Sequence, residues 1–141
     1  PPLVHCTAKV NSLGCTPSIA ATGFASLTDP TPFEIRASDV VNHRRGALVF
    51  GLGGPADTPW FGGTLCVGAP LVRGPLLNSG GSAAPLDCSG QFRFNFNAWI
   101  QAGTRPGWLA ATRIDAQFWY HDPGAAGGIG STNAMAFWIC P

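Results

Sequence analysis

The feature that most constrains the fold is a period-two alternation of apolar and polar residues. In the segment QFRFNFNAWI, residues 91–100, phenylalanine stands at 92, 94 and 96 with polar residues between. In TRIDAQFWY, residues 112–120, one face holds Ile114, Ala116, Phe118 and Tyr120. Successive side chains of a strand point to opposite faces, so both segments predict half-buried strands. No ten-residue window shows a helical period, although NAWIQAG, residues 97–103, could form one helical turn.

Other segments extend the β pattern. MAFWIC, residues 135–140, is apolar on both faces and predicts a central strand. With 19 glycines and 13 prolines among 141 residues, turns must be frequent, including one at 105–107. We predict one all-β domain over residues 1–141, an antiparallel, disulfide-stapled β-sandwich of jelly-roll type with about eight strands. Those strands are expected in residues 3–10, 18–26, 32–38, 46–53, 64–70, 91–100, 112–120 and 135–140.

The chain has five cysteines, an odd number. Residues 68–90 form a long link without expected structure, and Cys66 and Cys88 stand near its ends, so this disulfide is the first expected pair. Cys6–Cys15 ranks second, with Cys140 as an alternative partner for either, because sequence alone cannot choose the connectivity. Cys140 is the candidate for the unpaired residue, either as a buried inert thiol or as a link to another chain.

The stretch HCTAKVNSLGC, residues 5–15, holds the residue types of a metal site or of a thiol nucleophile with its base. Zinc sites use close ligand pairs, and Cys6 and Cys15 are too far apart, so no metal is expected. His5 adjoins Cys6, and adjacent side chains of a strand point to opposite faces, which disfavours a catalytic pair. Asp115 and Asp122 could be paired carboxylates, but Asp122 precedes Pro123, as a turn-starting residue does. We expect no enzyme activity, catalytic residue or cofactor.

Charge and hydropathy exclude other classes. The chain has 8 Lys and Arg against 7 Asp and Glu, a net charge of +1, which provides no basic surface for nucleic acid. No apolar run approaches the roughly 20 residues of a membrane helix, so no membrane span is expected. A freely diffusing protein with so few charges is poorly protected against association, which favours a surface covered by copies of itself or by glycan.

Three tryptophans are candidates for contacts with a partner. Trp60 and Trp108 stand in Gly- and Pro-rich links, and Trp119 is expected on the polar face of its strand. Exposed aromatic side chains serve carbohydrate binding and protein interfaces equally, and they could also only cover the rims of the sandwich. Threonines near proline are the candidate O-glycosylation sites, namely Thr28, Thr31 and Thr58.

The start of the chain suggests a processed, secreted protein, because the only methionine is Met135. Residues 1–10 open with two prolines and continue as an apolar strand-like segment. Such an arm could add to the sheet edge of a neighbouring subunit. The competing interpretation is that the segment pairs within its own sandwich, where Cys6 fixes it.

The segments CTAKVNSLGC, GGTLCV, LDCSG, AQFWYHDP and NAMAFWICP resemble a module of large secreted proteins of environmental bacteria. The similarity runs over most of the chain and implies an extracellular β-rich domain. It supplies no activity, cofactor or catalytic residue. A common version of the motif has Arg where this chain has His121.

Together these observations predict an extracellular or cell-surface structural subunit that self-assembles into a filament, tubule or surface coat. The alternative is a secreted carbohydrate-binding or adhesive β-sandwich module that uses Trp60, Trp108 and Trp119.

Overall fold

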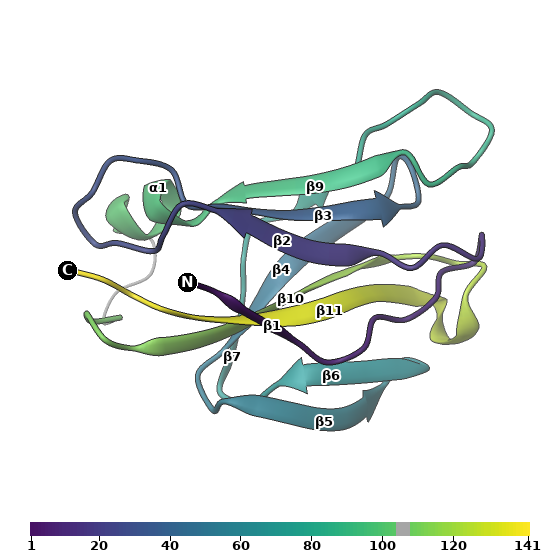
Figure 1. Cartoon of the computed structure of the whole chain (residues 1–141). Coiled ribbons are helices and arrows are strands. Elements are labelled where there is room, and N and C mark those ends of the chain that lie inside the picture. Colours follow the sequence, from purple (N-terminus) through teal and green to yellow (C-terminus); the bar gives the residue numbers. More distant parts are fainter. Residues whose placement is uncertain (104–107) are drawn as a thin grey trace.

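The computed structural model describes residues 1–103 and 108–141, which form an antiparallel β fold in three layers (Figure 1). The turn expected at 105–107 lies outside these residues. The largest layer, sheet A, has the order β1 (Leu3–His5), β11 (Ile129–Trp138), β10 (Arg113–His121), β4 (Arg45–Gly51), β7 (Leu71–Arg73), and β8 (Leu77–Asn78) also pairs with β4. Sheet B has the order β2 (Ser18–Thr22), β3 (Glu34–Val40), β9 (Gly90–Asn95). The third layer is the hairpin of β5 (Pro55–Trp60) and β6 (Gly63–Val67).

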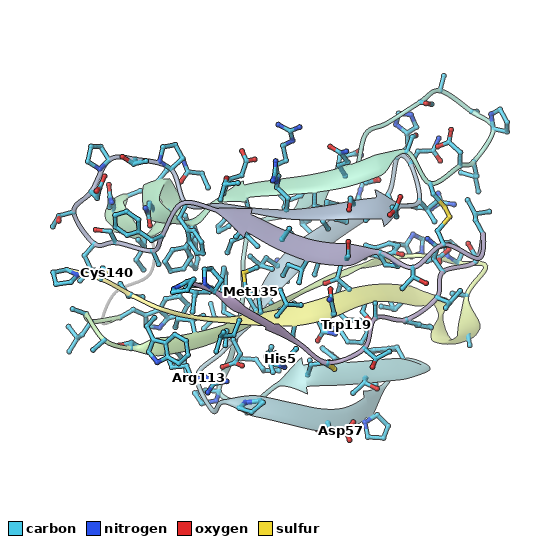
Figure 2. The ribbon with its side chains drawn as sticks, viewed as in Figure 1. His5, Asp57, Arg113, Trp119, Met135 and Cys140 are labelled. Carbon is cyan, nitrogen blue, oxygen red and sulfur yellow. A yellow bond between two sulfur atoms is a disulfide. The ribbon has the colours of Figure 1, made fainter. Side chains whose placement is uncertain are left out.

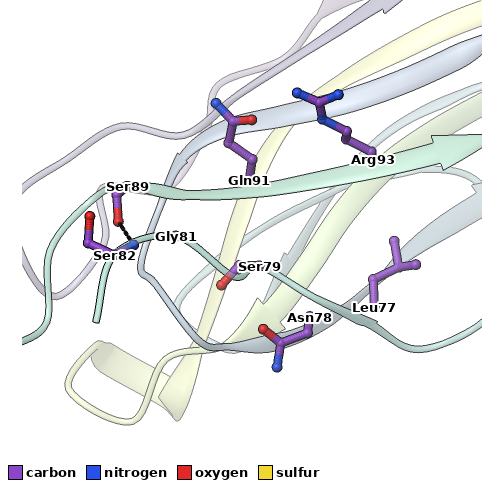
Figure 3. A pocket seen from close by; sticks show the side chains of 8 residues that line it. All are labelled: Leu77, Asn78, Ser79, Gly81, Ser82, Ser89, Gln91 and Arg93. Carbon is purple, nitrogen blue, oxygen red and sulfur yellow. Dashed lines mark hydrogen bonds between the residues drawn. The ribbon is translucent and has the colours of Figure 1, made fainter. Parts of the chain in front are cut away.

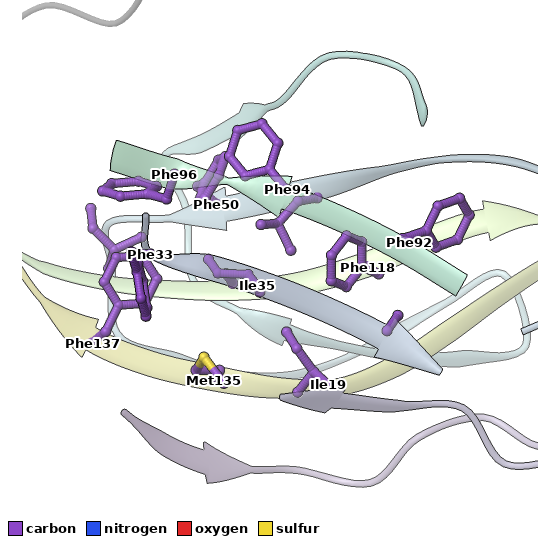
Figure 4. Close-up of a cluster of buried hydrophobic side chains, with 14 of the residues drawn as sticks. Ile19, Phe33, Ile35, Phe50, Phe92, Phe94, Phe96, Phe118, Met135 and Phe137 are labelled. Atoms are coloured by element: carbon purple, nitrogen blue, oxygen red, sulfur yellow. The ribbon is translucent and has the colours of Figure 1, made fainter. Parts of the chain in front are cut away.

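The main core lies between sheets A and B (Figure 4). Phe92 and Phe94 of β9 point inward while the residues between them are exposed, as the alternation predicted. Phe118 of β10 stacks on Phe92 with ring centroids 5.6 Å apart. Each fully buried aromatic or aliphatic side chain contributes about 1.5–3 kcal/mol relative to exposure. This core therefore supplies most of the apolar stabilisation.

The helix α1 (Phe96–Gln101) continues directly from β9 and closes one end of the core. The Asn95 side chain accepts a hydrogen bond from the Ala98 N–H at 3.1 Å, which caps the first turn. Gly103, with φ of 75°, follows the last turn in the left-handed conformation that ends many helices. The short helix expected in residues 97–103 is confirmed. None of the described helices is long and apolar enough to cross a membrane.

Sheet A is buried on both faces, which the alternation of β10 did not predict. Trp119 was expected on an exposed polar face, yet it is only 8% exposed, and Gln117 on the same face is fully buried. The hairpin β5–β6 lies over this face and packs Cys66 and Val67 against it. The expectation of a central strand is confirmed for residues 135–138, since β11 ends at Trp138 and lies between β1 and β10.

Eleven strands occur among the described residues, against about eight expected. β7 and β8 lie inside the link 68–90, which was expected to be structureless, and both pair with β4. Strands of two or three residues carry no period-two signal, so they could not be recognised. The N-terminal β1 pairs with β11 of its own chain, Leu3 opposite Ala136, which is the arrangement that competed with an extended arm.

Candidate functional site

The cysteines form two disulfides, Cys6–Cys66 and Cys15–Cys88, and Cys140 is free and exposed. The four expected cysteines are bonded, but the expected pairs Cys66–Cys88 and Cys6–Cys15 are wrong. The N-terminal segment runs between two elements and is linked to each of them. Its first cysteine meets the hairpin at β6, and its second meets the loop before β9. The alternative of a buried Cys140 thiol is also wrong.

Each disulfide closes a long loop, with sequence separations of 60 and 73 residues. Loops of this length correspond to about 4 kcal/mol each in the chain-entropy model. Disulfides form and persist in oxidising compartments. The N-terminal segment therefore acts as a strap across the three layers.

Lys9, the only lysine, reinforces this strap. Its Nζ donates hydrogen bonds to the carbonyls of Phe61, at 2.9 Å, and of Ile129, at 2.6 Å, and also to the carbonyl of Ala126. The ammonium group thereby joins the turn of the β5–β6 hairpin to the turn between β10 and β11.

The first exposed apolar surface is the hairpin cleft, a cavity of 340 Å³ between the hairpin and sheet A. Trp60 lies against Trp119 with ring centroids 4.9 Å apart. Phe61 is 49% exposed and Leu76 is 59% exposed at its mouth. Further lining residues include Arg45, Arg73, His121 and Ile129. Neither arginine side chain has an ion pair or hydrogen bond within the described part of the chain.

The second exposed apolar surface is the end groove, a hollow of 150 Å³ beside the end of β11. Phe24, 49% exposed, and Trp138, 42% exposed, contribute its aromatic side chains. Cys140 also lines it, and Figure 2 places Cys140 at the end of the molecule away from Trp119. Ile129 of the hairpin cleft and Trp138 of the end groove are the first and last residues of β11. The two surfaces therefore lie about 30 Å apart along this strand.

A third surface, the polar groove, has a volume of 660 Å³ (Figure 3). It is formed by β8, the loop that follows β8, and β9. Its lining residues are Leu77, Asn78, Ser79, Gly81, Ser82, Ser89, Gln91 and Arg93.

The two aspartates considered as paired carboxylates, Asp115 and Asp122, each have hydrogen-bond partners that hold the fold together. Asp115 is fully buried, and it accepts hydrogen bonds from Arg113 Nε at 2.9 Å and Nη2 at 3.1 Å, with His5 Nε2 2.9 Å away. Its partners Arg113 and His5 are labelled in Figure 2. Asp122, also buried, accepts hydrogen bonds from the N–H and hydroxyl of Ser12 at 2.9 and 2.5 Å. Its carbonyl accepts from the Ala125 N–H, so it starts a turn as expected. Among the described residues, no three His, Cys, Asp or Glu side chains are grouped to hold a metal.

Two partly exposed carboxylates have a lowered pKa because of hydrogen bonds in their own turns. The hydroxyl and N–H of Ser89 lower the pKa of Asp87, and the Thr31 N–H lowers that of Asp29. Hydrogen bonds that favour the charged form cause such shifts in ordinary turns. The lowered pKa values of Asp87 and Asp29 therefore do not indicate a catalytic role.

The three candidate tryptophans do not share one face. Trp60 and Trp119 meet in the hairpin cleft, whereas Trp108 stacks on Phe96 at 6.3 Å beside the main core. The threonines at 28, 31 and 58 are all exposed. The sequence interpretation did not select Phe61, Leu76, Phe24 or Trp138. Single exposed apolar residues carry no pattern, and only the fold brings these together.

No protein-family model matches the sequence, and neither a curated protein nor a solved structure matches it. The resemblance to a module of secreted bacterial proteins stays a prediction.

Proposed function

We propose that this protein is a structural subunit of an extracellular, self-assembling polymer such as a filament, tubule or surface coat. The observation that carries the proposal is the pair of exposed apolar surfaces at opposite ends of β11, the hairpin cleft and the end groove. Contact between two different surfaces of identical subunits repeats from copy to copy. It builds a fibre unless the rotation closes a ring.

The free thiol allows a second kind of contact between copies. Cys140 is exposed in the end groove while the other four cysteines are paired. In the oxidising compartment that the disulfides indicate, such a thiol can form a disulfide with the Cys140 thiol of another copy. That link would join two end grooves, so it is distinct from the head-to-tail contact and is not required for it.

The strand order supports a sandwich of immunoglobulin-like type in place of the expected jelly roll. Sheet B, β2-β3-β9, corresponds to strands A, B and E, and β11-β10-β4-β7 corresponds to G, F, C and C′. Sandwiches of this type are frequent in cell-surface proteins, although a fold alone does not define a function. The resemblance to secreted bacterial modules points to the same extracellular location. No catalytic residue or cofactor is part of the proposal.

The second candidate is a carbohydrate-binding or adhesive module. It is favoured by Trp60 and Phe61, whose rings lie 5.2 Å apart at the mouth of the hairpin cleft. Aromatic pairs of this kind could stack on sugar rings. In this case Trp60→Ala abolishes binding on a glycan array and leaves the oligomeric state unchanged.

Negative-stain microscopy and sedimentation of the purified protein test the main proposal. We expect polymers of the wild type, and we expect Phe61→Ser to shift the protein toward monomer. A buried interface aromatic contributes on the order of 2–4 kcal/mol of association. Leu109→Ser is the matched control, because Leu109 is 68% exposed and lines neither surface. A wild type that stays monomeric at high concentration refutes the proposal.

A further inference from the structure

The outer face of sheet B carries two arginines directly opposite each other. Arg36 of β3 pairs in register with Arg93 of β9. Both point outward, because the neighbouring Ile35 and Phe92 are fully buried in the core. Like charges directly opposite on adjacent strands destabilise a sheet. The stability of the sheet therefore does not account for the presence of two arginines at these positions.

Few groups on the protein compensate these charges. Glu34 Oε1 is 3.7 Å from Arg36 Nε, which is too long for a hydrogen bond. The Arg93 side chain has no ion pair or hydrogen bond within the described residues. Among the described residues Arg36 thus has only this long ion pair, and Arg93 presents an unpaired guanidinium group to solvent.

These arginines adjoin the polar groove. Gln91 and Arg93 line the groove of 660 Å³ and also a second hollow of 240 Å³ that Ala20, Arg36 and Ser38 line. The two hollows share these side chains, so one extended surface crosses the sheet from β2 to the loop before β9. Its side chains are mainly guanidinium, amide and hydroxyl groups.

The loop that forms one wall of the polar groove is held in place. Cys88 ties it to Cys15, and the fully buried Asn42 donates to the Ser82 carbonyl at 2.7 Å and accepts from the Asp87 N–H at 3.0 Å. Gly81 has φ of +89°, and a Cβ there would lie 2.5 Å from Ser89 Oγ, so only glycine fits. A wall fixed in this way lowers the ordering cost of binding.

We propose that the polar groove and the Arg36–Arg93 pair bind a linear acidic polysaccharide. The carboxylate or sulfate of one sugar is held by the guanidinium groups, which match such anions with paired hydrogen bonds. Hydroxyls of neighbouring sugars bond to Gln91, Asn78 and the serines of the loop. The groove lining contains no aromatic side chain for stacking bases, which disfavours single-stranded nucleic acid. This site shares no lining residue with the assembly surfaces and does not depend on the proposed function.

The test compares two variants that remove the same charge. Arg93→Gln changes the proposed site, and Arg73→Gln changes the rim of the hairpin cleft. Binding of polygalacturonate and dextran sulfate is measured by calorimetry at concentrations where sedimentation gives all proteins the same oligomeric state. Neutral dextran and a single-stranded oligonucleotide are the comparison ligands.

We expect the wild type to bind the acidic polysaccharides and not neutral dextran. The Arg93→Gln variant should bind about fivefold more weakly, as the loss of one exposed charged contact implies. The Arg73→Gln variant should bind as the wild type does. Three results overturn the proposal: no binding by the wild type, an equal loss in both variants, or tighter binding of the oligonucleotide. Sedimentation reports assembly separately, so failure here leaves the proposed function standing.

Discussion

The two faces of sheet A are both buried, but by different interactions. The inner face packs apolar side chains such as Phe118 and Ile114 against sheet B. The outer face, under the hairpin β5–β6, carries Gln117, Asp115 and Trp119 and is crossed by the Cys6–Cys66 disulfide. The inner face needs only hydrophobic burial, whereas the outer face needs specific polar partners and a covalent link.

Gln117 shows how the outer face is specified. Its Nε2 donates to the carbonyls of Thr64, at 3.0 Å, and Thr132, at 2.8 Å. Its Oε1 accepts from the Cys66 N–H at 3.0 Å and from Trp119 Nε1 at 3.1 Å. One buried amide thus joins β10 to β11 and to the hairpin. Buried polar groups satisfied in this way favour a single arrangement of the elements around them.

The two faces of sheet A also have different roles in this account: the inner face concerns stability, and the outer face concerns the proposed function. The inner face holds the sandwich together, while the hairpin layer forms the cleft through which we propose that subunits join. A layer held by a few crosslinks can open locally without global unfolding. The predictions below distinguish the two layers.

The largest effect is expected on the inner face. Phe118→Ala should lower the free energy of unfolding by about 3–5 kcal/mol, because a fully buried ring is lost from a close-packed core. Urea denaturation measures this loss, and the transition should stay cooperative. A loss below about 1 kcal/mol would contradict the assignment of this face as the main core.

Removing the Cys6–Cys66 disulfide should lower the free energy of unfolding by a comparable amount, but the structural change should be confined to the hairpin. Cys6→Ser with Cys66→Ser should cost up to about 4 kcal/mol. Hydrogen exchange of residues 55–67 should accelerate while the amides of β3 and β9 stay protected. The matched control is Cys15→Ser with Cys88→Ser, which should leave the hairpin protected. Equal exchange of the hairpin in both variants would show that the disulfide does not hold this layer.

A smaller loss is expected from Gln117→Leu. The change leaves buried groups on the hairpin and β11 without partners, at a cost of about 1–3 kcal/mol for each one that finds no water. Thermal unfolding measures the loss, and Trp119 fluorescence should report a looser hairpin. An unchanged melting temperature would mean that water replaces the amide fully.

Tyr120 should give the smallest effect, confined to alkaline pH. Burial raises the pKa of Tyr120 from its ordinary value of 10.0 to about 12, with the nearby Asp122 charge adding to the rise and the Asn11 side chain opposing it. A raised pKa means that its contribution is fully present below pH 10.0 and is lost as pH rises toward about 12. Tyrosinate absorbance follows this single tyrosine directly.

Tyr120→Phe is the matched control, because the Tyr120 hydroxyl is buried without a hydrogen-bond partner in the described part of the chain. We expect it to be as stable as the wild type at pH 8 and less dependent on pH above 10. A tyrosinate midpoint near the ordinary value would contradict the burial of this ring.

The sequence predicted the inner face well and the outer face poorly, for a physical reason. Alternation at Phe92, Phe94 and Phe118 marks the side of each strand that leaves water, and no other information is needed. The burial of Trp119 depends on which element folds over it. A strand was expected at 64–70, which overlaps β6, but none was expected at β5, and nothing in either strand indicates where the hairpin packs. The disulfide partners depend on the same long-range path, so cysteine spacing along the chain gave the wrong pairs. Of the proposed assembly surfaces, the sequence indicated Trp60, Trp119 and Cys140, whereas Phe61, Leu76, Phe24 and Trp138 were missed for this reason too.

The central functional claim is that two different surfaces meet head to tail, and a mixing experiment tests it most directly. One variant, Phe61→Ser with Leu76→Ser, removes the hairpin cleft, and another, Phe24→Ser with Trp138→Ser, removes the end groove. Both carry Cys140→Ser so that no covalent link forms, and far-UV circular dichroism confirms that they fold. Sedimentation velocity should show each variant alone as a monomer and the equimolar mixture as a dimer, since one intact surface of each kind remains. A mixture that stays monomeric, or a single variant that still polymerises, would contradict the head-to-tail account.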